Sequence, residues 1–183
     1  ANIAVGGSAL GANINGGQNV AIGVQSLMIN SSGNHNVAVG TNTFNANTSG
    51  SYNTGIGGFA LQYNTTADFN TAVGYGALSS NTTGTNNTAV GVNSLDANTT
   101  ASNNTAIGRH ALGANTTGAN NTAVGKDALL SNTTGSQNVA VGYQALENNV
   151  TGANNVAIGY QALEASTHGS NVAVGYQASR LQT

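Results

Sequence analysis

The 183-residue sequence contains no cysteine, proline or tryptophan, and only 4% of its residues are charged. The absence of cysteine excludes disulfides and thiolate metal sites. Because Lys and Arg total only three, no basic patch can neutralise a phosphate backbone, which argues against a nucleic-acid partner. No apolar run approaches the roughly 20 residues that a membrane-spanning helix needs, so no membrane insertion is expected. The lack of proline leaves every backbone N–H available for a hydrogen-bonded ladder.

What the sequence has instead is one unit that recurs every 17 residues from end to end. A glycine, which we call the register glycine, follows an apolar pair in each unit. The register glycines of coils 1 to 11 are Gly6, Gly23, Gly40, Gly57, Gly74, Gly91, Gly108, Gly125, Gly142, Gly159 and Gly175, the last of which comes one residue early. Disordered low-complexity sequence needs no such register, so the pattern predicts a stacked-coil solenoid. We therefore expect a single repeat domain over residues 1–183.

The residues that lead up to each register glycine predict a short strand. Asn stands four residues before the glycine, Ala two before except at Gly55, and Val or Ile immediately before. This alternation has a period of two, so the β-branched residues share one face and Asn and Ala share the other. We expect the β-branched face inside, the Ala column outside, and the Asn column in a ladder of side-chain amides. The members of that ladder are Asn19, Asn36, Asn53, Asn70, Asn87, Asn104, Asn121, Asn138 and Asn155.

A second short strand is expected after each register glycine, where Ala or Ser and then Leu follow at the third and fourth residues. The Leu column should complete the interior. Asn-Thr-Thr-Gly, as at 81–84 and 115–118, predicts a turn, because Asn and Gly tolerate positive φ. Glycine and β-branched residues disfavour helix. The predicted fold class is therefore all-β, a parallel β-solenoid (β-roll) of about eleven coils with two short strands each. At about 4.8 Å per coil it would form a rod roughly 50 Å long.

Several strings resemble repeats of known fibrous proteins. QNVAIG (18–23), HNVAVG (35–40), QNVAVG (137–142) and NNVAIG (154–159) resemble the repeat of trimeric autotransporter adhesin heads. NTAVGYGALSSNTTG (70–84) and NNTAVGVNSLDANTT (86–100) look like collar and shaft repeats of bacteriophage tail fibres. The resemblance covers the whole chain and implies a β-roll, left-handed in the adhesin heads, with three chains around a common axis. The longer repeat and the Leu column favour the tail-fibre branch.

The expected function is a non-enzymatic, extracellular structural or adhesive fibre segment of a virion or a cell surface. Catalysis needs a few unlike groups at one place, whereas this sequence presents the same groups eleven times. Many identical sites would suit weak multivalent contact with a surface. The outward Ala column would let neighbouring chains approach closely, so the expected partners are two further copies in a homotrimer. A cell-surface glycan or receptor is a further candidate partner.

Tyrosine and glutamine form the candidate ligand ladder. Tyr75, Tyr143, Tyr160 and Tyr176 follow their register glycines directly, and Gln144, Gln161 and Gln177 come next to the last three. Stacked tyrosines offer rigid amphipathic area to a glycan or another fibre. The alternative, which we favour, is a ladder that faces solvent or another subunit and has no ligand.

Other patterns give no cofactor or metal site. GIGGFA (55–60) formally matches a dinucleotide-binding loop, but it arises because Gly55 replaces the repeat Ala, and no crossover helix is expected after it. His35, His110 and His168 occupy three different repeat positions, so they form no metal trio. The Asp-rich nonapeptide of calcium-binding β-rolls is missing.

Threonine pairs support an alternative function. The pairs from Thr65/Thr66 to Thr133/Thr134 recur at a regular rise, as in an ice-binding solenoid, although adjacent side chains diverge. Asn-x-Ser/Thr triplets would be glycosylation acceptors in a eukaryotic secretory pathway, a use that a bacterial or viral origin disfavours. These triplets begin at Asn30, Asn47, Asn64, Asn81, Asn98, Asn115, Asn132 and Asn149.

The last coils supply two further expectations. Glu164 and Arg180 each lie five residues after a register glycine, so stacking should pair them in a salt bridge. No polar cap is visible near Ala1 or Thr183. The sequence is therefore either the ordered part of a larger protein or a subunit that stacks end to end into a filament, and we favour the filament.

Overall fold

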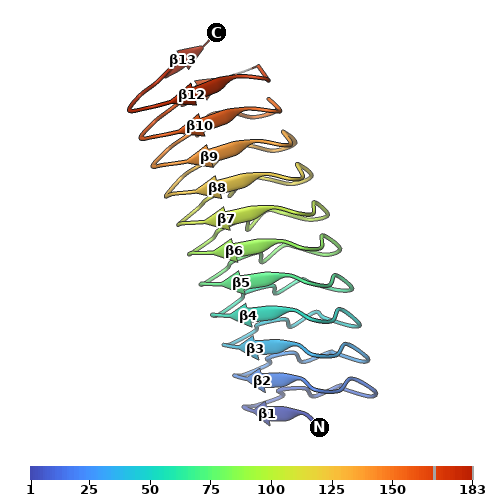
Figure 1. Ribbon diagram of the computed structural model, residues 1–183. Helices are drawn as coiled ribbons and strands as arrows, with labels where there is room; N and C mark the ends of the chain where they lie inside the picture. The colour runs from blue at the N-terminus through green and yellow to red at the C-terminus, as the bar shows by residue number, and fades with distance from the viewer. Residues whose placement is uncertain (167, 183) are drawn as a thin grey trace.

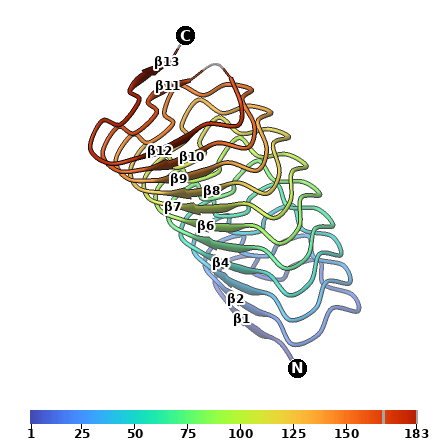
Figure 2. The ribbon, with the colours of Figure 1, turned by 45° about the horizontal axis from the view of Figure 1, so that its top comes forward.

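A computed structural model describes residues 1–166 and 168–182, and over them the chain is an all-β parallel solenoid of about ten turns. Each coil contributes one three-residue strand, and these strands stack in chain order into an 11-stranded parallel sheet (Figure 1). The two termini lie at opposite ends of the stack. Figure 2 shows the connecting loops of successive coils nested one behind another. In the described part of the chain no helix is long and apolar enough to cross a membrane.

The strands confirm the prediction of one strand directly before each register glycine. The large sheet consists of β1 (Ile3–Val5), β2 (Val20–Ile22), β3 (Val37–Val39), β4 (Thr54–Ile56), β5 (Thr71–Val73), β6 (Thr88–Val90), β7 (Thr105–Ile107), β8 (Thr122–Val124), β9 (Val139–Val141), β10 (Val156–Ile158) and β12 (Val172–Val174). Each strand pairs in register with the next, as Ile3 does with Val20, so equal repeat positions stand above one another. β11 (Ala165–Ser166) and β13 (Leu181–Gln182) form a separate two-stranded parallel sheet.

The interior is filled by alanine, leucine and asparagine. Ala72 and Ala106, two residues before their register glycines, are fully buried, whereas Ile107, immediately before its glycine, is 41% exposed. The prediction that the β-branched residues face inward and the Ala column outward is therefore wrong. The physical reason is that Ala is small and that buried Asn finds hydrogen-bond partners inside a narrow coil. The expected burial of the Leu column is confirmed, as at Leu78 and Leu112.

In coils 1 to 9 the segment after the register glycine is a series of tight turns with no second strand, contrary to the prediction. Only the last two coils have a second short strand, β11 and β13, and these begin six residues after Gly159 and Gly175. In coil 5 the backbone N–H groups of Ala77, Ser79 and Asn81 each donate to a carbonyl three residues earlier. Leu78, in the middle of this segment, has a φ of 53°. A strand requires a negative φ at every residue, so a left-handed residue in each coil converts the segment into turns.

Positive φ also distinguishes two kinds of glycine. Gly74 has a φ of 134°, and a Cβ there would lie 2.5 Å from the carbonyl oxygen of Gly91, so only glycine fits at the register position. Gly84 of an Asn-Thr-Thr-Gly segment has no left-handed φ, contrary to the turn chemistry that we expected. Its lack of a side chain instead accommodates the backbone oxygen of Ala101 in the next coil. The left-handed residue near this turn is Asn86, with a φ of 58°.

Candidate functional site

The predicted Asn ladder exists, but it runs inside the solenoid. The backbone N–H of Asn36 donates to Oδ1 of Asn19 one coil away, at 2.9 Å, and Nδ2 of Asn36 donates to the carbonyl of Gly50, at 2.8 Å. The first of these contacts recurs along the column up to Asn155, and its members are almost fully buried. These amides satisfy backbone groups, so the Asn column is structural and offers nothing to a ligand.

A second buried Asn column stands seven residues after the register glycine. Nδ2 of Asn81 donates to Oδ1 of Asn64, at 3.0 Å, and to the carbonyl of Gly84, at 2.9 Å. Three further triplets, which begin at the exposed Asn86, Asn103 and Asn120, lie outside this column. The same two contacts recur from Asn30 to Asn149, so each of the eight triplets within the column has its amide nitrogen buried and hydrogen-bonded. The folded chain therefore offers no glycosylation acceptor at these triplets. The 17-residue recurrence of this Asn, as regular as that of the predicted ladder, could have identified the column.

The structure stacks three of the four predicted tyrosines. Tyr143 and Tyr160 have ring centroids 5.2 Å apart, as do Tyr160 and Tyr176, and the rings are nearly parallel. The side-chain amides of Gln144, Gln161 and Gln177 are hydrogen-bonded to one another in the same order, at 2.9 Å. Tyr75 lies outside this ladder and forms a T-shaped pair with Phe59. The neighbouring rings cover both faces of Tyr160, and Nζ of Lys126 lies 5.0 Å from the centroid of the Tyr143 ring. The ladder therefore presents mainly ring edges and hydroxyls to solvent, with the 74% exposed Tyr176 at its end.

A second aromatic column was missed in the sequence. The rings of His35, Tyr52 and Phe69 stack with centroid distances of 4.8 and 5.3 Å, and all three residues stand five before a register glycine. Tyr52 and Phe69 are more than half exposed. The signal is present in the sequence, since the three residues are spaced 17 apart, but three different residue types occupy the position.

The outer face of the large sheet carries an apolar column that is exposed in most coils. Ile22, Ile56 and Ile158, each immediately before a register glycine, are 40–42% exposed. No Asp, Glu, Lys or Arg stands within any strand of this sheet. A continuous apolar column of this kind is typical of a contact surface.

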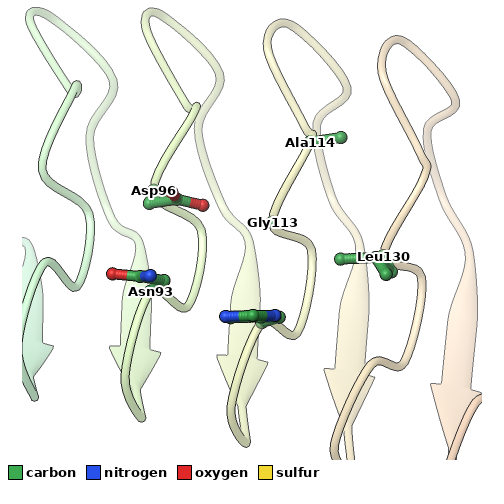
Figure 3. Close-up of a pocket in the computed structure, with 6 residues that line it drawn as sticks. Asn93, Asp96, Gly113, Ala114 and Leu130 are labelled. Atoms are coloured by element: carbon green, nitrogen blue, oxygen red, sulfur yellow. The ribbon is translucent and has the colours of Figure 1, made fainter.

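A small group of ionisable side chains lies at a surface hollow of about 360 Å³ and beside it. Its lining consists of Asn93, Asp96, His110, Gly113, Ala114 and Leu130 (Figure 3). Nδ1 of His110 lies 3.7 Å from Oδ1 of Asp127, whose Oδ2 lies 2.9 Å from Nζ of Lys126. Burial raises the pKa of Asp96, and the backbone N–H of Asp96 and the nearby His110 lower it by less. The hydrogen bond to Asp127 raises the pKa of Lys126.

Metal and nucleotide sites find no support within residues 1–166 and 168–182. No group of three His, Asp or Glu side chains in that part of the chain could hold a metal ion. The segment 55–60 belongs to β4 and the turns after it, and Gly55 is packed against Phe44 in the interior. The predicted salt bridge is confirmed, with Nε of Arg180 2.5 Å from Oε2 of Glu164, so the register of the last, shortened coil is as expected.

Comparisons add no relative to this description. The chain matches no family model, and neither the curated proteins nor the solved structures contain a similar chain at a significant level. The fold and the surfaces described above therefore carry the functional argument.

Proposed function

We propose that this chain is a non-enzymatic, extracellular fibre segment whose solenoids associate side by side into a homotrimer through the outer face of the large sheet. The observation that carries the proposal is the exposed apolar column immediately before the register glycines, which includes Val90 and Ile107. An isolated solenoid would leave this column in water along its whole length, and association buries it. Such a fibre segment would belong to a virion or to a cell surface.

The residues that would make the contact between chains differ from those that the sequence suggested. The Ala column cannot mediate contact between chains, because residues such as Ala89 and Ala123 are fully buried within their own coil. The β-branched column takes over that role. A threefold arrangement and a left-handed coil are what the resemblance to adhesin heads implies, and both remain part of the proposal.

An adhesive role would use surfaces that remain free in such a trimer. The ladder of Tyr143, Tyr160 and Tyr176 repeats one chemical group at a regular spacing, which suits weak contacts that gain strength by number. A cell-surface glycan or receptor is the proposed partner. End-to-end association into filaments is a further proposal, which electron microscopy of the purified protein tests.

The oligomeric state of an outer-face variant tests the proposal. We expect the mass of the wild type in solution to be three times that of one chain. Val90→Lys combined with Ile107→Lys places two charges on the outer face and should yield monomers with an unchanged β-type circular dichroism spectrum. The control is Thr83→Lys with Thr100→Lys, two exposed positions outside the strands, which should remain trimeric. A monomeric wild type, or a double outer-face variant that stays trimeric, contradicts the proposal.

Ice binding is the alternative, and one observation favours it. The Thr residues three before the register glycines of β4 to β8 lie half-buried on the same outer face, in register from strand to strand. The paired threonines considered first are less suited, because Oγ1 of Thr82 donates to the carbonyl of Thr99 at 2.9 Å. A thermal-hysteresis assay separates the two functions, since strong activity in a monomeric chain would replace the fibre with an ice-binding solenoid.

A further inference from the structure

The hollow between coils 6 and 8 exists because one coil lacks a side chain that its neighbours carry. Gly113 stands five residues after its register glycine, where the flanking coils have Asp96 and Leu130. Figure 3 shows Asp96 and Leu130 extending toward each other from either side of Gly113. A Cβ built on Gly113 would lie 3.2 Å from Cδ1 of Leu130 and 3.5 Å from Oδ1 of Asp96. The missing side chain of Gly113 therefore lets a carboxylate and an aliphatic side chain approach each other in the lining of the hollow.

Polar groups of two kinds converge on the hollow. The carboxylate of Asp96 is an acceptor, whereas the side-chain amide nitrogen of Asn93 and the imidazole of His110 supply donors. The side-chain oxygen of Asn93 faces Gly76 of the preceding coil. Leu130 and Ala114 add an apolar wall. In a chain that is only 4% charged, such a mixed cluster departs from the repeat. The volume of about 360 Å³ lies at the small end of the range for ligand pockets.

This combination selects the class of ligand. An anion would face the carboxylate of Asp96, and a simple amine would leave the donors of Asn93 and His110 without partners. A neutral sugar ring has hydroxyls that both donate and accept, and it has C–H groups that pack against Leu130. We propose that the hollow binds one residue of a neutral saccharide, with Asp96, Asn93 and His110 on its hydroxyls.

The hollow is separate from the proposed interface between chains. Its six lining residues all lie in the turns after the register glycines, and none belongs to a strand of the large sheet. Side-by-side association through the outer face would therefore leave it open. The assignment deepens the proposed adhesive function and rests on it for its biological meaning. Because the hollow is open to solvent, single-site affinity should lie in the millimolar range, and a trimer would present three copies.

A variant that fills the hollow tests the assignment. Gly113→Gln introduces the residue that coil 4 carries at the same repeat position, Gln62, and Gly113 has no left-handed φ that would strain a side chain. The matched control is Gly11→Gln, at the same position of coil 1. Both variants are titrated, with the wild type, by amide NMR against D-glucose, D-galactose and N-acetyl-D-glucosamine, and against methylammonium chloride and sodium acetate as charged probes.

We expect at least one sugar to shift amides between residues 93 and 130 of the wild type and of Gly11→Gln. The affinity should fall at least tenfold in Gly113→Gln, whose thermal midpoint should match that of the wild type. Absence of sugar-induced shifts in this segment, shifts that persist in Gly113→Gln, or a response to a charged probe alone would overturn the assignment. A trimer without sugar shifts would reject only the hollow, whereas sugar binding by a monomeric wild type would reject only the proposed trimer.

Discussion

The ring of Phe44 occupies the space that a side chain on Gly55 would need. A Cβ built on Gly55 would lie 2.6 Å from Cε2 of Phe44. Both residues depart from the repeat, since Phe44 stands in the Leu column and Gly55 in the Ala column, and they meet across the interior of the solenoid. The larger and the smaller residue thus compensate each other in volume.

We predict strong coupling between these two positions. Gly55→Ala overpacks the interior and should cost about 1–3 kcal/mol. Phe44→Leu leaves a cavity and should cost about 1–2 kcal/mol. The double variant restores the Leu and Ala of the other coils and should be close to the wild type, so the coupling should equal the sum of the two single costs, about 2–5 kcal/mol. Thermal unfolding of the four proteins at one chain concentration measures the cycle, and additive effects would contradict the compensation.

The sequence predicted the strands, their register and the Glu164–Arg180 pair, because a fixed period places equal positions above one another. It did not predict which face of each strand lies inside. Alternation with a period of two separates the two faces but does not show which one is buried. The usual preference for buried Val was overridden by Asn residues whose amides find hydrogen-bond partners in their own and in neighbouring coils. The positive φ of Leu78 could not be predicted from the sequence either, because Leu does not favour the left-handed conformation by itself.

The candidate site was predictable only in part. Stacked Tyr143, Tyr160 and Tyr176 follow directly from their equal repeat position. The hollow could not be predicted from repeat positions, because it depends on the missing side chain of Gly113 and on how far Asp96 and Leu130 extend over this glycine. A local departure from a repeat can be recognised as a candidate site only when its neighbours in space are known.

Two adjacent glycines should differ sharply in their tolerance of a side chain. Gly57, a register glycine, has a φ of 127°, and a Cβ there would lie 2.6 Å from the carbonyl oxygen of Gly74. Gly58 has no left-handed φ, and its nearest neighbour would be the ring of Tyr75 at 3.6 Å. Gly57→Ala should therefore cost about 3 kcal/mol or more, and Gly58→Ala less than about 0.5 kcal/mol. Equal thermal midpoints for the two variants would contradict the backbone geometry.

Asp96 should make stability depend on pH. Because burial raises its pKa, the folded chain holds this proton more tightly than the unfolded chain does. The resulting stabilisation is present in acid, below the ordinary pKa of the carboxyl, and is lost as the pH rises through the raised pKa. Asp96→Asn should therefore raise the thermal midpoint at pH 7, and the difference should shrink as the pH falls toward 3.

The matched control for Asp96 is Asp68→Asn. Oδ1 of Asp68 accepts the backbone N–H of Ser51 at 2.6 Å, so the charge has a partner, and its removal should give no gain at neutral pH. A pH-independent difference between Asp96→Asn and the wild type would indicate that the substitution acts through packing and would contradict the prediction.

The second Asn column ends at Asn149, because Ser166 stands where the next Asn would be. Oδ1 of Asn149 is buried and accepts no hydrogen bond from any described residue. Ser166→Asn would supply the missing Nδ2 donor at the position that Asn fills in the coils below. We expect a gain of about 1 kcal/mol, seen as a higher thermal midpoint. In an Asn149→Ala background the acceptor is gone, so the same substitution should give no gain there. An equal gain in stability in both backgrounds would show that Ser166→Asn does not act through a hydrogen bond to Oδ1 of Asn149.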